Sequence, residues 1–190
     1  MSEMLLKLND VHLNFPARKN WRGKVVERVY ALNGLDMAAW RGETLGIVGE
    51  SGSGKSLTCY AINGLLADCF SVEGSIRFNG EDLLAQSEQD RRAMRGKRIA
   101  MILQSPMTAF NPLFTIGNQV TETLCRHLQC TPQEALAVMA NTFGKINLRD
   151  PQQLFGKYPH ELSGGMLQRI ITSFAIALKP ELIIADEPTT

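Results

Sequence analysis

The stretch "GESGSGKS", residues 49–56, decides how the rest of the chain is interpreted. It fits the pattern GxxxxGK[ST], in which a glycine-rich loop cradles phosphate groups. The apolar run "TLGIVG" (44–49) before it is typical of a buried parallel strand. The amphipathic "KSLTCYAINGLL" (55–66) after it favours a helix. The order strand, glycine loop, helix predicts a phosphate-binding loop rather than a plain glycine-rich turn.

The residue types of this loop suit phosphate binding. Gly49, Gly52 and Gly54 let the backbone curl so that successive N–H groups point inward, and the following helix adds its positive N-terminal end. Lys55 would reach the β- and γ-phosphates, and Ser56 would ligate Mg²⁺. We expect a nucleotide to be bound by the loop residues Gly49, Glu50, Ser51, Gly52, Ser53, Gly54, Lys55, Ser56 and Leu57.

A second motif, "LIIADE" (182–187), has the form of a Walker B strand. The apolar run would place it centrally in a sheet, and Asp186 would emerge at the carboxyl end to hold hydrated Mg²⁺. Open α/β sheets bind ligands at that edge. By itself an Asp-Glu pair is more often solvated surface. Together with the phosphate loop it predicts a catalytic site with Glu187 as the general base.

A third motif, "LSGGMLQR" (162–169), places a serine and two glycines at the start of a predicted helix. Ser163 would cap the helix, and Gly164 and Gly165 would leave its N–H groups open to an anion. In isolation this string would be an ordinary capped helix start. Its position after the phosphate loop favours a second anion-binding site.

Hydrophobic patterning predicts a mixture of strands and helices. We expect strands at 5–15, 29–40, 44–49, 74–80, 99–104 and 182–186. The polar and basic "PARKNWRGK" (16–24) would be an exposed connection, and an Asn-Gly turn would end the strand at 74–80. We expect helices at 116–128, 132–146 and 164–179.

Composition excludes several classes of protein. A formal net charge of +1 gives no basic excess for binding nucleic acid. The four cysteines have no CxxC spacing, which favours a reducing compartment over a zinc site or a disulfide framework. The N-terminal sequence lacks the pattern of a signal peptide, so we expect a cytoplasmic location.

Two segments have a composition that bears on membrane contact. Residues 99–121 carry no charge over 23 residues, but two prolines, two asparagines and two glutamines argue against a membrane helix. "RRAMRGKR" (91–98) holds five basic residues and is more simply a solvated helix face than a lipid-headgroup site. Any membrane contact should therefore be peripheral or through a partner.

In this order the motifs resemble those of ATP-binding cassette (ABC) ATPases, whose usual signature is LSGGQ. "FNPLFTIGNQV" (110–120) and "YPHELSGGM" (158–166) are similar to the subunits that power bacterial uptake of di- and oligopeptides and of nickel. Met166 departs from the usual glutamine, but methionine is familiar in this subfamily. The resemblance implies an α/β fold: a P-loop NTPase (RecA-like) core with an N-terminal antiparallel β part and a helical subdomain.

The resemblance also implies roles for further residues. Gln104 would be the Q-loop glutamine, which senses Mg²⁺ and nucleotide, instead of a plain strand-ending glutamine. Ser56, Gln104 and Asp186 would then be the metal ligands, and Lys55, Gln104 and Glu187 the catalytic residues. Ser163, Gly164 and Gly165 would contact ATP held by the opposite protomer. Phe15 would stack on adenine, with Tyr30 as the alternative.

Partners follow from the same resemblance. They are a second ABC ATPase subunit, more simply a paralogue than a copy, two integral membrane permease subunits, and a periplasmic or extracellular substrate-binding protein. The protein would lie at the cytoplasmic face of the membrane. A soluble ABC ATPase of translation or DNA repair, and a phosphate-loop kinase, are the alternatives. The kinase would have no use for "LSGGM" (162–166).

The resemblance finally suggests how the chain is divided. We expect one domain over 1–190, with the β part and phosphate loop at 1–104, the helical subdomain at 105–179 and the Walker B strand at 180–190. The family continues past "DEPTT" into a D-loop and a switch histidine, a role that His160 does not fill. We therefore expect a C-terminally incomplete cassette with weak activity on its own.

Overall fold

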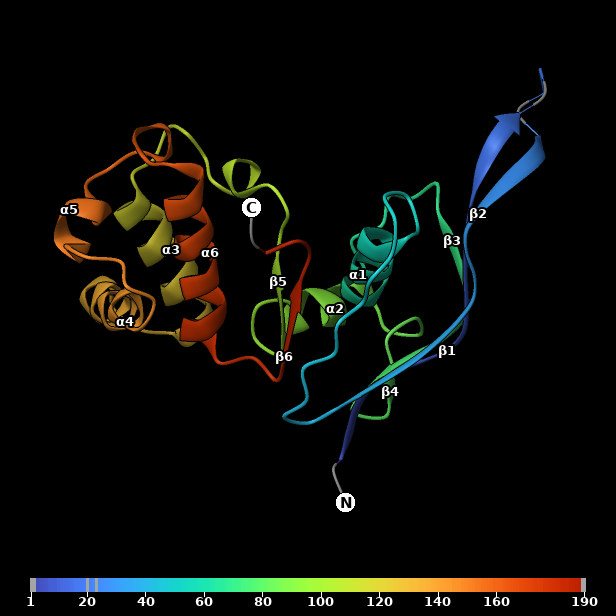
Figure 1. The fold of residues 1–190 in the computed structure, drawn as a ribbon, viewed down its shortest axis with the longest axis horizontal. Coiled ribbons are helices and arrows are strands. Elements are labelled where there is room, and N and C mark those ends of the chain that lie inside the picture. The colour runs from blue at the N-terminus through green and yellow to red at the C-terminus, as the bar shows by residue number, and fades with distance from the viewer. Residues whose placement is uncertain (1–2, 20, 23, 189–190) are drawn as a thin grey trace. The chain divides into compact units, whose positions relative to one another are not determined.

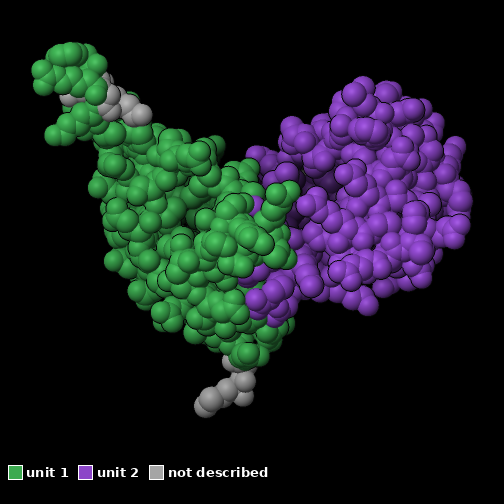
Figure 2. Space-filling model, turned by 180° about the vertical axis from the view of Figure 1, so that it is seen from behind, with its two compact units in different colours: residues 1–93 green, residues 94–190 purple. Residues whose placement is uncertain are grey.

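The computed structural model describes residues 3–19, 21–22 and 24–188. The chain forms two compact units, residues 1–93 and 94–190, coloured separately in Figure 2. Each unit has its own sheet.

The first unit is built on a four-stranded antiparallel sheet with the order β2-β1-β3-β4. Its elements are β1 (Met4–Lys19), β2 (Val25–Trp40), α1 (Lys55–Asn63), β3 (Ser71–Phe78) and β4 (Glu81–Asp82). Leu6 and Leu8 alternate with polar residues along β1, and they are buried on the same face as Ile76 and Phe78 of β3. This alternation fixes the register, because a slip of one residue would turn the apolar side chains to solvent.

The first two strands form a long hairpin, which Figure 1 shows in blue. Pairing runs from Met4 opposite Trp40 to Lys19 opposite Val25. The expected strands at 5–15 and 29–40 are therefore confirmed, but the expected connection at 16–24 is shorter than predicted. Polar residues at its two ends continue the ladder because backbone pairing does not require apolar side chains.

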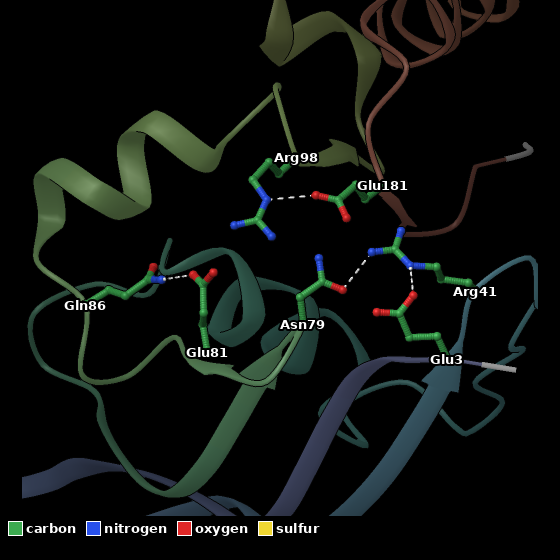
Figure 3. A network of polar contacts seen from close by, with 7 residues as sticks. All are labelled: Glu3, Arg41, Asn79, Glu81, Gln86, Arg98 and Glu181. Atoms are coloured by element: carbon green, nitrogen blue, oxygen red, sulfur yellow. Dashed lines mark hydrogen bonds and ion pairs between the residues drawn. The ribbon is translucent and has the colours of Figure 1, made fainter. Parts of the chain in front are cut away.

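One Asn-Gly turn and one arginine connect the ends of three strands of this sheet. Asn79 and Gly80 both have positive φ, 50° and 81°, as the predicted Asn-Gly turn requires. Arg41 donates hydrogen bonds of 2.9 Å to Glu3 and to Asn79 (Figure 3). The arginine therefore links the start of β1, the end of β2 and the turn after β3.

The expected strand at 44–49 is wrong in this structure. Residues 43–50 have no regular secondary structure, and Leu45, Ile47 and Val48 are 43%, 47% and 96% exposed. Within the described residues no strand pairs with this segment. An apolar run becomes a strand only where a neighbouring strand accepts and donates its backbone hydrogen bonds.

The helix after the phosphate loop is shorter than predicted. It was expected to reach residue 66, but α1 ends at Asn63 because Gly64 adopts the left-handed conformation with φ 61°. The N–H of Gly64 then bonds to the carbonyl of Ala61, which closes the last turn.

The second unit combines a parallel strand pair with a helical layer (Figure 1). Its elements are β5 (Ile99–Ile102), η1 (Pro106–Ala109), α3 (Ile116–Leu128), α4 (Pro132–Lys145), α5 (Pro151–Phe155), η2 (Pro159–Glu161), α6 (Gly164–Leu178) and β6 (Leu182–Ala185). The η elements are single 3₁₀ turns. A short helix, α2 (Glu88–Met94), crosses the boundary between the units.

Side-chain caps explain why the helices of this unit begin where they do. Thr115 and Ser163 accept hydrogen bonds from the third residue of α3 and of α6. Thr131 and Glu134 form a reciprocal capping box at the start of α4. The predicted helices at 116–128, 132–146 and 164–179 are confirmed, whereas α5 and both 3₁₀ turns were not predicted.

The helical layer has a single apolar core. Its completely buried side chains come from three helices: Val120 of α3, Met139 and Phe143 of α4, and Leu167 and Ile170 of α6. Burial of each such side chain contributes roughly 1.5–3 kcal/mol. No helix among the described residues is long and apolar enough to cross a membrane.

The strand pair is in register from Ile99 opposite Leu182 to Ile102 opposite Ala185. Arg98 donates to Glu181 at 2.8 Å just before both strands begin (Figure 3). The predicted strand at 182–186 is confirmed, but its expected place in a buried centre is not, because Ile183 is 44% exposed.

Candidate active site

The phosphate loop lies in the first unit and depends on one glycine. Gly54 is buried, has φ 92° and caps the start of α1. A Cβ atom at this position would lie 2.6 Å from Leu32 Cδ2 and 2.9 Å from the carbonyl oxygen of Ala31. Only glycine combines that backbone conformation with so close an approach to β2. The loop is therefore fixed by contact with the sheet.

The ammonium group of Lys55 lies over the loop. It donates to the carbonyl oxygens of Gly49 and Glu50, each at 2.7 Å, and lies 3.4 Å from Ser53 Oγ. The N–H of Ser53 bonds to Glu50 at 3.2 Å and closes a turn. Residues 49–53 are exposed, so a ligand can approach their N–H groups.

The candidate adenine-stacking residue Phe15 packs on another aromatic ring. The centroids of Phe15 and Phe70 are 5.2 Å apart with an interplanar angle of 61°, an edge-to-face contact. Phe70 was not predicted from the sequence, because nothing in its local sequence indicates this contact. Tyr30, the alternative, is 59% exposed.

The acidic pair lies in the second unit, where β5 and β6 end. Asp186 is 5% exposed, and its N–H donates to Ile102 at 3.0 Å, which continues the ladder beyond β6. Gln104 donates through Nε2 to the carboxylate of Glu187. Glu187 is exposed and has φ 47°, a conformation uncommon for a residue with a side chain. The structure thus brings together two residues that were predicted separately.

The predicted metal ligands were Ser56 in the first unit and Gln104 and Asp186 in the second. They would offer a hydroxyl, an amide oxygen and a carboxylate. Mg²⁺ binds oxygen ligands and commonly takes only one or two carboxylates. The chemistry of this donor set therefore fits Mg²⁺.

The glycine-rich start of α6 is open to solvent. Gly164 and Gly165 are exposed, and a Cβ on either would meet no atom within 4 Å. Ser163 Oγ accepts from the N–H of Met166 at 3.3 Å, and the first turn contains no acidic residue. The open backbone N–H groups and the helix dipole together suit an anion.

A carboxylate organises the turn before this helix. The N–H of Tyr158 donates to the Glu161 carboxylate at 2.7 Å. This bond lowers the pKa of Glu161, whereas partial burial raises it, and the nearby Lys157 lowers it further. His160 stacks on Tyr158, with ring centroids 5.5 Å apart. This role of Glu161 was not predicted from the sequence, although a glutamate three residues after a helix-capping position is a recognised signal.

Comparison with known proteins places the chain in a family. Residues 32–190 match the ABC transporter family. The chain belongs to this family. The resemblance to ABC ATPases in the sequence motifs is thus confirmed.

Several curated relatives of this ABC transporter chain are import subunits. It is 48% identical over 150 residues to the metal-staphylopine import system ATP-binding protein CntD of Staphylococcus aureus, covering 79% of this chain and 55% of the relative. It is 39% identical over 189 residues to the oligopeptide transport ATP-binding protein OppD of Salmonella typhimurium, covering 100% of this chain and 54% of the relative. The chain spans about half the length of the curated relatives that it matches.

Solved structures confirm the predicted fold class. The dimeric structure of MJ0796, a bacterial ABC transporter cassette, has a TM-score of 0.78 and 25% identity over 97% of this chain and 75% of that one. A post-hydrolysis state of the same cassette, bound to ADP and Pi, has a TM-score of 0.77 at 24% identity, with the same coverage.

Proposed function

We propose that this chain supplies the ATP-hydrolysing site of an ABC importer for di- or oligopeptides, or for nickel or a metal chelate. The observation that supports it most is the hydrogen bond from Gln104 to Glu187 beside the buried Asp186. Both residues lie where two parallel strands end, which is the edge at which α/β sheets bind ligands, and there Glu187 would act as the base and Gln104 would orient it.

ATP would be bound by the exposed phosphate loop. A lysine ammonium group has three N–H donors, and Lys55 directs two of them to Gly49 and Glu50. The third would donate to a phosphate oxygen in place of the long contact to Ser53. Each charge-assisted hydrogen bond to phosphate contributes roughly 1.5–3 kcal/mol. Phe15 would stack on the adenine, supported from the side by Phe70.

Hydrolysis would rest on the acidic pair. Glu187 would accept a proton from the attacking water, and Gln104 would keep its carboxylate in position. Bound through Ser56, Gln104 and Asp186, Mg²⁺ would supply positive charge that offsets the charge developing on the phosphate oxygens. A positioned base contributes about 10² to 10⁴ in rate.

Coupling to transport would require further subunits. The open start of α6 would contact ATP held by a second cassette, so that nucleotide is bound between two chains. Membrane permease subunits and a substrate-binding protein would complete the importer, with this chain at the cytoplasmic face. The relatives named above, an oligopeptide transport protein and a metal-staphylopine import protein, support this assignment.

The test measures Mg-ATP binding and phosphate release by the chain and by Glu187→Gln. We expect unchanged binding and a loss of phosphate release of at least about a hundredfold. Glu122→Gln, the same charge change on the exposed face of α3, is the matched control and should change neither. Lys55→Met should lose binding. Near-normal release by Glu187→Gln would remove Glu187 as the base.

A further inference from the structure

The C-terminal end of α3 brings two cysteines together. Gln129 adopts the left-handed conformation, with φ 53° and ψ 41°, and its N–H donates to the carbonyl of Cys125 at 3.0 Å. A helix end of this type turns the next residue back against the last helical turn, where a side-chain contact commonly forms. Here the two residues concerned are Cys125 and Cys130.

The two thiols lie at one helix end and are only partly exposed. Cys130 Sγ lies 3.8 Å from the carbonyl oxygen of Leu124, the residue before Cys125. Both side chains pack against the apolar core of the second unit. Partial burial, and then the neighbouring Cys130, raise the pKa of the Cys125 thiol above its ordinary value.

Other uses of the pair are less well supported. A metal site would need more ligands, and among the described residues no group of three or more His, Cys, Asp or Glu side chains is arranged to hold a metal ion. The pair belongs to none of the motifs assigned to ATP. The remaining two cysteines lie in the first unit, Cys59 buried and Cys69 exposed.

We propose that Cys125 and Cys130 form a reversible intramolecular disulfide by exchange with a low-molecular-weight disulfide. One thiolate of the pair attacks a sulfur of the small disulfide, forms a mixed disulfide and releases one small thiol. The second cysteine then loses its proton and attacks the protein sulfur of that mixed disulfide, which releases the second small thiol. The protein pair is oxidised by two electrons, and the small disulfide is reduced to two thiols.

The bond would lock the connection between two core helices. Cys130 immediately precedes Thr131, the N-cap of α4, and Cys125 lies in the last turns of α3. The cross-link would therefore tie the end of one helix to the start of the next. The helix end turns Cys130 back toward the turn that holds Cys125, and this local geometry favours this pair over any pairing with Cys59 or Cys69 of the first unit.

The sequence offers a direct assay, because Arg126 separates the two cysteines. The chain is incubated with oxidised glutathione, its remaining thiols are alkylated, and it is digested with trypsin, which cleaves after Arg98, Arg126 and Lys145. We expect peptides 99–126 and 127–145 to appear as one species that separates on reduction. Without the bond they would appear as two peptides.

The controls separate this outcome from a folding defect. Cys125→Ser and Cys130→Ser should each abolish the linked species, and Cys69→Ser should leave it unchanged. The melting temperature of each reduced variant verifies that it is folded. Recovery of Cys125 and Cys130 only as separate glutathione adducts, or linked only between molecules, would overturn the proposal.

Discussion

Replacement of Gly54 by alanine tests the placement of the phosphate loop against β2. Its φ of 92° costs a residue with a side chain roughly 1–2 kcal/mol. The added Cβ would also lie 2.9 Å from the backbone oxygen of Ala31, and overpacking of this kind costs about 1–3 kcal/mol. We therefore expect Gly54→Ala to lower the free energy of unfolding by about 2–5 kcal/mol and to weaken Mg-ATP binding.

Two other glycines separate the causes of this effect. Gly52 has φ 81° but open space around it, so Gly52→Ala should show only the backbone cost of roughly 1–2 kcal/mol. Gly144 in α4 has neither constraint, and Gly144→Ala should stabilise by up to about 1 kcal/mol. Urea unfolding of the three variants gives the comparison. A Gly54→Ala variant no less stable than Gly52→Ala would refute the close approach to β2.

Three further changes address the cap, the core and the nucleotide. Hydrogen bonds from Thr131 lower the pKa of Glu134. The stabilisation that Glu134 contributes is therefore present above the ordinary carboxyl pKa and is lost as the pH falls through the lowered pKa. We expect Glu134→Ala to destabilise the protein at pH 7 but not in acid, and urea unfolding at each pH would show this. Phe143→Ala should cost about 3–5 kcal/mol in the free energy of unfolding, because the ring is completely buried. Phe15→Ala should weaken ATP binding in a titration by about 1–3 kcal/mol while Tyr30→Ala does not, and the reverse result would reassign the stacking residue.

Helices were predictable from the sequence where their start signals are local. Thr115, Thr131 and Ser163 each precede an apolar periodic run, and the structure starts a helix after each of them. The prediction of a strand at 44–49 was wrong for the opposite reason. Its apolar run resembles a central strand, but a strand is completed by neighbours that can be distant in sequence, and local hydrophobicity carries no information about them.

The parts of the site were more predictable than their arrangement. Loop chemistry predicts a role for Lys55, and strand pattern predicts one for Glu187, each from a few adjacent residues. The bond from Gln104 to Glu187 joins positions 83 residues apart and depends on the parallel register of β5 and β6. Neither the edge-to-face contact of Phe15 nor the packing of Gly54 on β2 has a local signal, since both partners come from other elements.

The adjacent acids Asp186 and Glu187, at the end of β6, are held in position by different parts of the structure. Asp186 is the last residue whose position the sheet dictates, through its bond to Ile102. Glu187, one peptide bond later, is oriented by its own backbone turn and by Gln104. A displacement of the segment that begins at Gln104 would therefore reorient the carboxylate of Glu187 while that of Asp186 stays in place. Glu187 can thus be reoriented without moving Asp186, because the backbone hydrogen bonds between β5 and β6 end at Asp186.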